Sequence, residues 1–206
     1  MDTSKVHVSG NVFSRILLFF GLYTLLFNAA FLIGYYWLPE GILRATPATA
    51  AGQVVATAQT FWGQLGFTLL FNLGSILVAS ISMNLFQIKG VSLGILLPFF
   101  LAVFSGLVTG TNSFVSSDMT QYNVRDGTAL ALSIQTFEML GYLFIVSATV
   151  GLGIFQYRSL WQWKPSKVIK LRDIKLSKPE MMCVVIGILL IIFGAFRETM
   201  LSFNML

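Results

Sequence analysis

The chain is poor in the residues on which most catalytic, metal-binding and disulfide-stabilised proteins depend. Its 206 residues include one cysteine and one histidine, Cys183 and His7, and only 10% of them are charged. A single cysteine excludes an internal disulfide and gives no support to a metal site. His7 precedes the first apolar stretch, so no histidine is available as a catalytic group inside a membrane. Soluble domains carry about 25% charged residues, so this composition argues against a water-soluble fold.

Catalytic motifs are missing as well. The sequence has no HExxH, no Gly-x-Ser-x-Gly, no Walker sequence and no pair of aspartates within its apolar stretches. Those stretches also contain no histidine or lysine, so a serine there has no obvious general base. We therefore expect a protein that is not an enzyme and that holds no cofactor and no metal ion.

Long apolar stretches dominate what is present. The chain is 56% hydrophobic, and five of its stretches approach or exceed the roughly 20 residues that a helix needs to cross a bilayer. No internal repeat is evident, and no polar segment is long enough to form a separate soluble domain. The sequence predicts an all-α integral membrane protein, with residues 1–206 forming one bundle of five transmembrane helices near 13–38, 61–86, 91–114, 128–156 and 181–203.

The distribution of lysine and arginine predicts the orientation. If the N-terminus lies inside, 10 of the 13 basic residues fall on the inner side, and Arg44, Arg125 and Arg197 fall on the outer side. Because cytoplasmic loops are enriched in Lys and Arg, we expect the N-terminus inside and the C-terminus outside. The first span is much longer than the apolar core of a cleavable signal peptide, so we expect it to be retained. The expected location is the cell (plasma) membrane.

The predicted cytoplasmic loop 157–180 is strongly basic. It carries seven Lys or Arg against Asp173 and Glu180, together with two tryptophans. Basic residues beside a span attract anionic lipid headgroups, each with about 1 kcal/mol, and we expect this role first. Docking of a cytoplasmic partner is the alternative, whereas nucleic-acid binding is not expected of a short loop that is tethered at both ends. The candidate residues are Arg158, Trp161, Trp163, Lys164, Lys167, Lys170, Arg172, Lys175 and Lys178.

Small residues at a spacing of four mark the third predicted span. Gly90 and Gly94 form one such pair, and Gly106 and Gly110 form another. Glycines at this spacing let helix backbones approach closely, which is how transmembrane helices associate without a hydrophobic driving force. We expect these four glycines to pack against neighbouring helices.

Two predicted spans contain charged residues away from their ends, and these residues are the best candidates for a functional site. Glu138 lies in the fourth span, and Arg197 and Glu198 lie in the fifth, at depths compatible with contact. Charges in hydrocarbon are retained mainly where they have a partner or a task. We expect a Glu138–Arg197 ion pair, with Gln135 and Asn72 as supporting hydrogen-bond partners and Glu198 facing the outer interface. Such a pair could lock two helices together, relay a proton or ion, or dock a partner.

Four short motifs resemble the stage II sporulation protein M family of small multi-span membrane proteins. Two lie in spans two and three: Phe71-Asn72-Leu73, and Phe104-Ser105-Gly106 followed by Gly110. The other two lie in spans four and five: Phe137-Glu138, and Gly194-Ala195-Phe196-Arg197-Glu198. Ser133-Ile134-Gln135 stands where the family has Pro-His-Gly before its glutamate. The resemblance implies a membrane scaffold that recruits partners, as the sporulation protein does for peptidoglycan-remodelling enzymes.

These observations together predict a membrane-embedded scaffold or an accessory subunit of a larger membrane complex. The expected partners are anionic membrane lipids and other membrane proteins, or further copies of the chain. The alternative is a permease or channel subunit that moves a small solute or ion through spans two to four. A transporter typically has more ionisable residues near the midplane or broken helices, and only Pro98 hints at these features here.

Overall fold

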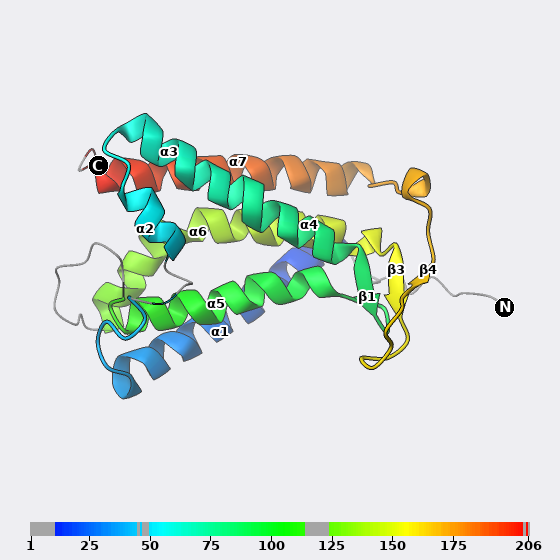
Figure 1. The fold of residues 1–206 in the computed structure, drawn as a ribbon, viewed down its shortest axis with the longest axis horizontal. Helices are drawn as coiled ribbons and strands as arrows, with labels where there is room; N and C mark the ends of the chain where they lie inside the picture. Colours follow the sequence, from blue (N-terminus) through cyan, green and yellow to red (C-terminus); the bar gives the residue numbers. More distant parts are fainter. Residues whose placement is uncertain (1–10, 45, 47–49, 114–123, 204, 206) are drawn as a thin grey trace.

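The computed structural model describes residues 11–44, 46, 50–113, 124–203 and 205, and at 51, 56, 75, 124–135 and 171 it describes the backbone alone (Figure 1). The chain is mostly helical, and its helices run back and forth along an elongated bundle. Helix α1 begins at one end of the bundle, and helix α7 ends at the other.

Four of the helical stretches are long and apolar enough to cross a membrane. Among the described residues these are Val12–Trp37, Phe61–Asn84, Leu93–Gly110 and Lys178–Ser202. The fourth predicted span corresponds to helix α6 (Val124–Thr149) and the 3-10 turn η4 (Val150–Leu152), within which the apolar helical part is the shorter stretch Thr136–Leu152. The chain is therefore a multi-span helical protein by helix length and composition.

Local signals explain where the first and last helices begin. Helix α1 (Val12–Trp37) is capped by Asn11, whose side-chain oxygen accepts a hydrogen bond from the Phe13 N–H at 3.2 Å. Helix α7 (Lys178–Ser202) begins with a capping box, in which Ser177 and Glu180 bond each other's backbone N–H groups. Both caps satisfy N–H groups that a helix start otherwise leaves without a partner.

The second span consists of three successive helical segments. Helix α3 (Phe61–Leu69) passes into a π-helix, η2 (Leu70–Leu77), and then into α4 (Val78–Asn84). A short helix, α2 (Ala50–Ala56), precedes them. A π-helical segment inside an α-helix is rare and is frequently found at functional sites, so the wide turn in the second span marks a position of interest.

A small four-stranded sheet closes one end of the bundle, which the all-α prediction did not include. Strands β1 (Phe86–Ile88) and β3 (Phe155–Tyr157) are parallel, and each also has an antiparallel partner, β2 (Val91–Ser92) and β4 (Ser166–Lys167) respectively. The predicted spans 61–86, 91–114 and 128–156 are therefore too long, because their ends are strand residues. Helices α4 and α6–η4 end next to each other. The strands that follow them, β1 and β3, hydrogen-bond to each other there, so the helices do not continue.

The parallel strands also reveal a short sequence match that was not evident from the sequence alone. Phe86 pairs with Phe155 and Gln87 with Gln156, and a basic residue follows each strand. The rings of Phe86 and Phe155 stack with centroids 5.1 Å apart. We call the end of the bundle formed by this sheet and residues 157–180 the basic end.

Two helix pairs, α1 with α5 (Leu96–Gly110) and α6 with α7, form the packed core of the bundle. At Gly110 an added Cβ would meet the Phe31 carbonyl oxygen and lie 3.0 Å from the Tyr35 nitrogen, and at Gly106 it would lie 2.8 Å from the Ala30 Cβ. These two glycines therefore pack α5 against α1, as glycine pairs in membrane helices do.

The other predicted packing glycines have different surroundings. Gly90 has a φ of +83° and forms the β1–β2 turn, so its role is conformational. Gly94 packs against the neighbouring helix α4, where an added Cβ would meet the Asn84 side chain and lie 2.8 Å from the Ser80 carbonyl oxygen. Two glycines of the α6–α7 pair were not predicted. An added Cβ at Gly141 would lie 2.6 Å from the Gly187 carbonyl oxygen, and one at Gly187 would lie 2.7 Å from the Gly141 carbonyl oxygen.

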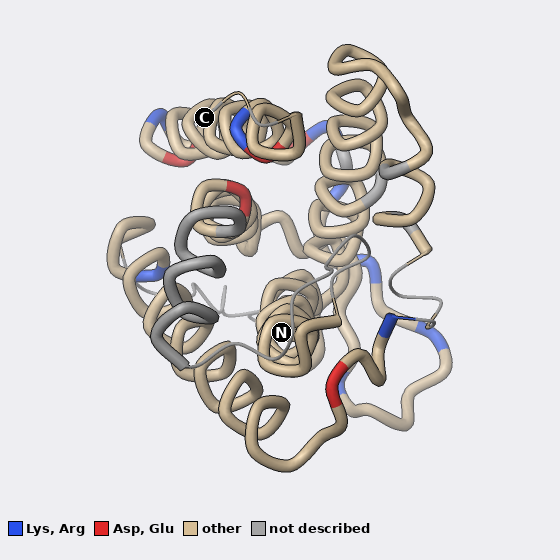
Figure 2. The backbone as a smooth tube through the Cα atoms, turned by 90° about the vertical axis from the view of Figure 1, so that its left-hand side faces the viewer, with Lys and Arg blue, Asp and Glu red and all other residues tan. Residues whose placement is uncertain are grey.

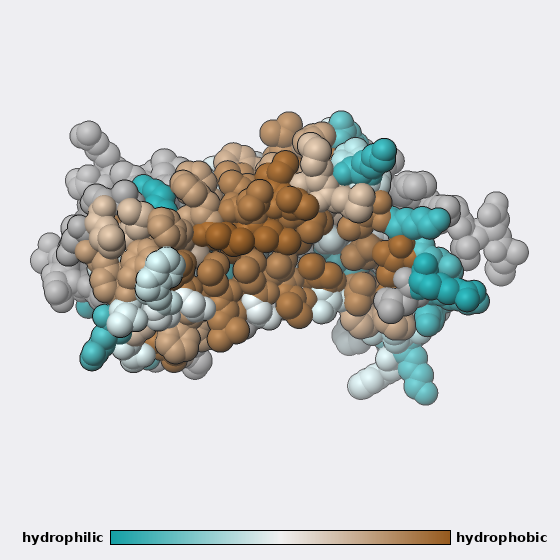
Figure 3. Space-filling view, turned by 90° about the horizontal axis from the view of Figure 1, so that it is seen from above, coloured by the Kyte–Doolittle hydropathy of each residue, from teal (hydrophilic) through white to brown (hydrophobic). Residues whose placement is uncertain are grey.

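Apolar and hydrophilic side chains occupy different parts of the surface. In Figure 3 the middle of the visible face is covered by apolar side chains, and hydrophilic residues gather toward the ends, most densely at the basic end. Large apolar side chains such as Leu17, Leu25 and Phe100 are 62–71% exposed on the helices. A soluble protein rarely exposes so continuous an apolar surface, whereas lipid covers it in a membrane.

Candidate functional site

A buried carboxyl group within the helices, that of Glu138, lies against Asn72 in the π-helix η2. Asn72 is 8% exposed, and its side-chain N–H donates a hydrogen bond to Glu138 Oε1 of helix α6 at 2.6 Å. The Tyr142 hydroxyl, one turn after Glu138, donates a long bond of 3.5 Å to the Asn72 carbonyl oxygen. Two contacts therefore join α6 to the π-helix, one to the side chain and one to the backbone of Asn72.

Helix α7 completes the site through a glycine. A Cβ added at Gly194 would lie 2.5 Å from Glu138 Cγ and 3.1 Å from the Glu138 nitrogen, so the missing side chain provides the space for Glu138. Glu198 follows one turn later on the same side of α7, within electrostatic range of Glu138. Figure 2 shows that α6 and α7 lie next to each other and that both contain acidic positions, drawn in red. We call Asn72, Glu138, Tyr142, Gly194 and Glu198 the carboxylate cluster.

The predicted Glu138–Arg197 ion pair is not formed. Between described residues the ion pairs are Arg15–Glu180 and Arg172–Asp173. Successive residues of a helix point about 100° apart, so Arg197 and Glu198 lie about 60° and about 40° from Gly194, on opposite sides of it. One guanidinium nitrogen of Arg197, Nη1, is buried and has no hydrogen-bond partner in the described part of the chain.

The other three residues predicted for this site, Asn72, Gln135 and Glu198, have different outcomes. Asn72 is the supporting partner that donates to Glu138. The side chain of Gln135 lies outside the described residues. Glu198 is half-buried near the end of α7, and its expected position at the outer interface stays a prediction. Tyr142 and Gly194 were missed, although each lies four residues from a glutamate, at the spacing of one helical face.

The carboxylate cluster can do two things chemically. It joins the second, fourth and fifth helical passes through buried side chains, so it can fix their relative positions. Two neighbouring carboxylates in a low-dielectric interior also repel each other when both are ionised, so the cluster has the composition of a site for a proton or a small cation. Carboxylate and amide oxygens are the usual ligands of hard cations.

A second charged region lies at the basic end, where the sheet holds loop 157–180. The seven basic side chains of this loop are all exposed, and so are Trp161 and Trp163, at 90% and 97%. The loop is anchored to the bundle, because it follows β3, contains β4, and its Val168 N–H donates to the Ile154 carbonyl oxygen at 2.9 Å. Its cations and tryptophans are therefore presented from a backbone that is fixed to the bundle.

An ion pair ties the first and last helices together at the same end. Arg15 of α1 donates to Glu180 Oε1 of α7 at 3.0 Å, and both side chains are mostly buried. The other carboxylate oxygen of Glu180 bonds Ser177 in the capping box. The Ser-x-x-Glu spacing was a visible signal for the cap, whereas nothing in the sequence indicated the partner 165 residues away.

No protein-family model, no curated protein and no solved structure matches the chain.

Proposed function

We propose that this chain is a non-enzymatic, membrane-embedded scaffold or accessory subunit of a larger membrane complex. In this proposal it has five spans in the cell membrane, with the N-terminus and the basic end inside and the C-terminus outside. The excess of Lys and Arg at the basic end supports that orientation. The same role is implied by the resemblance to the stage II sporulation protein M family.

The observation that carries the proposal is the fixed presentation of exposed tryptophan and positive charge at the basic end. Trp163 is 97% exposed, and the neighbouring Lys164 and Lys167 are exposed on either side of the start of β4. Tryptophan is enriched among the residues that dominate binding energy at protein interfaces, and a rigid backbone reduces the ordering entropy of binding. The charge favours an acidic surface on the partner, which we take to be another membrane protein.

Purification from native membranes tests this proposal. A mild-detergent pull-down of the tagged chain should recover one or more membrane proteins at fixed stoichiometry. Trp163→Ala combined with Lys167→Glu should remove them, whereas Arg172→Gln, whose charge is already paired with Asp173, should not. A chain that purifies alone, or whose partners are indifferent to the double substitution, contradicts the proposal.

A second function, the passage of a proton or small cation, is favoured by the carboxylate cluster. Glu138 and Glu198 lie in helices of the membrane-spanning bundle, and the π-helix places Asn72 against one of them. In liposomes this function predicts a proton or alkali-cation flux that Glu138→Gln lowers at least tenfold. Purified chain that produces no flux above protein-free liposomes excludes this function and leaves the cluster as a structural joint.

A further inference from the structure

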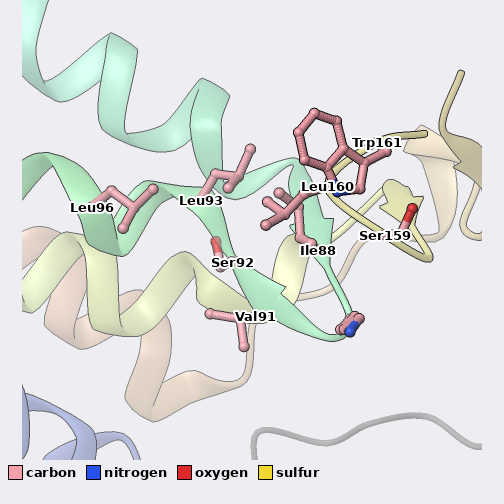
Figure 4. Close-up of a pocket in the computed structure, with 9 residues that line it drawn as sticks. Ile88, Val91, Ser92, Leu93, Leu96, Ser159, Leu160 and Trp161 are labelled. Carbon is pink, nitrogen blue, oxygen red and sulfur yellow. The ribbon is translucent and has the colours of Figure 1, made fainter. Parts of the chain in front are cut away.

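The basic end contains a cavity of about 370 Å³ between the β1–β2 hairpin, the start of α5 and the segment that follows β3. Figure 4 shows Trp161 and Leu160 on one side and Leu93 and Leu96 on the other, with Ile88 between them. Lys89, Ser92, Val91 and Ser159 complete the lining. The cavity therefore has mainly apolar walls with one cation and two hydroxyl groups.

The apolar wall of the cavity continues along helix α5 toward the middle of the bundle. Leu96, Phe100 and Val103 are 54%, 62% and 37% exposed, and their spacing of four and then three residues places them on one face of the helix. Leu93–Gly110 is one of the stretches apolar enough to cross a membrane. The cavity thus joins a strip of helix surface that hydrocarbon chains would cover.

Lys89 occupies an unusual backbone position at the edge of this cavity. Its φ is +50° and that of Gly90 is +83°, a two-residue hairpin turn that normally takes Asn-Gly or Gly-Gly. Residues with long side chains adopt a positive φ only when the surrounding structure imposes it. Here the Lys89 N–H donates to the Tyr157 carbonyl oxygen at 2.9 Å, which fixes the turn beside the loop that carries Trp161.

The two serines of the lining differ in their availability. The Ser92 hydroxyl is engaged, because it donates to the Asn84 side-chain oxygen and accepts from the Gly94 N–H. Ser159 lies next to the exposed Arg158 in the segment after β3. The polar side of the cavity therefore offers Lys89 and Ser159, with Arg158 adjacent.

We propose that this cavity binds one anionic glycerophospholipid. Its phosphate lies at Lys89 and Ser159, and one acyl chain runs past Leu96 and along the exposed strip of α5. Trp161 covers the glycerol region, at the headgroup level where tryptophan is enriched in membrane proteins. A soluble anion would use only the polar corner, and a zwitterionic lipid would place a second cation next to Lys89. This site is independent of the partner surface around Trp163.

Lipid titration of the purified full-length chain tests the site, with bound lipid counted by native mass spectrometry. The probes are phosphatidylglycerol and phosphatidylcholine with identical acyl chains, and glycerol phosphate. Lys89→Asn removes the charge and introduces a residue that readily adopts a positive φ. Lys164→Asn is its matched control on the loop. Trp161→Ala has Trp163→Ala as its control, since both rings are almost fully exposed and only Trp161 lines the cavity.

We expect the parent chain to bind phosphatidylglycerol more tightly than phosphatidylcholine. Lys89→Asn should weaken phosphatidylglycerol binding about fivefold, the equivalent of about 1 kcal/mol for one basic residue near the headgroups. Trp161→Ala should weaken it several-fold, and each control should weaken it less than its matched test substitution does. All four variants have exposed side chains at the altered position, and their melting temperatures serve as the folding check.

Three results would each overturn the proposal. The first is equal binding of the two phospholipids, which would indicate unspecific contact with acyl chains. The second is equal weakening by the test and control substitutions, which would indicate a diffuse basic surface. The third is glycerol phosphate binding as tightly as the lipid, which would indicate an anion site without an acyl chain.

Discussion

The carboxylate cluster and the basic end handle charge in opposite ways. In the cluster, Glu138 is buried among three helical segments and takes its hydrogen bond from Asn72. At the basic end, seven cations are exposed, and the backbone of two separate connections pairs into a sheet. Polar groups inside a span depend on one another for stability, whereas those at the end remain free for ligands. Substitutions in the first region should therefore change stability, and those in the second should change binding.

Asn72→Leu should have the largest effect on stability. It removes the donor that lies 2.6 Å from Glu138 Oε1 and leaves a buried carboxylate beside Glu198. Losing the hydrogen-bond partner of a buried carboxyl group costs about 3 kcal/mol, which unfolding by sodium dodecyl sulfate in mixed micelles would measure. Asn28→Leu is the matched control, because Asn28 is exposed on α1 and bonds only the Thr24 carbonyl oxygen of its own helix. Equal effects of the two substitutions would mean that Glu138 does not depend on Asn72.

Gly194→Ala should destabilise the chain by about 2 kcal/mol, the usual range for overpacking. The new methyl group would lie 2.5 Å from Glu138 Cγ and 3.1 Å from its backbone nitrogen, so α6 and α7 would have to separate. Gly66→Ala is the control, since a Cβ there meets nothing within 4 Å and alanine favours the helix. The same unfolding assay compares the two. If Gly194→Ala is no less stable than Gly66→Ala, α7 does not pack on Glu138 as described.

Part of the carboxylate cluster could be predicted from the sequence. Glu138 was identifiable because a charge in an apolar stretch is rare, and Asn72 because it is polar in a similar context. The choice between Arg197 and Glu198 as the neighbour of Glu138 depends on the rotation of α7, which the packing of Gly194 sets. A uniformly apolar helix has no polar face in its sequence from which that rotation could be derived.

The fold, too, could be predicted only in part. The apolar stretches were visible because length and composition suffice to detect a spanning helix. The sheet was not visible, because strands of two or three residues produce no periodic pattern and β1 lies 69 positions from its parallel partner β3 in the register. The shared Phe-Gln at positions 86–87 and 155–156 was its one signal, and it became meaningful only when the strands were seen side by side. Likewise, the π-helix at Leu70–Leu77 has no recognised sequence pattern.

Arg15→Gln should have an intermediate effect, because its ion pair lies at the basic end but is mostly shielded from solvent. The Arg15–Glu180 side chains are 11% and 20% exposed and 3.0 Å apart, whereas those of Arg172–Asp173 are 77% and 57% exposed and 3.7 Å apart. We expect a loss of about 1 kcal/mol for Arg15→Gln and no measurable loss for Arg172→Gln in the unfolding assay. The loss should shrink in high salt only slightly, because burial limits screening. Equal losses would remove the distinction between the two pairs.

Trp163→Ala should have the smallest effect on stability, below about 0.5 kcal/mol, because a side chain that is 97% exposed has almost no packing to lose. Its effect should instead appear in the recovery of partner proteins from native membranes, which the proposed scaffold role predicts will fall. Asn72→Leu should lower stability but leave the recovery of partner proteins unchanged, provided that the pull-down is done under conditions where this variant is still folded. If Trp163→Ala destabilises the bundle as much as Asn72→Leu does, then the basic end is part of the core, and the division between a stabilising interior and a binding end is wrong.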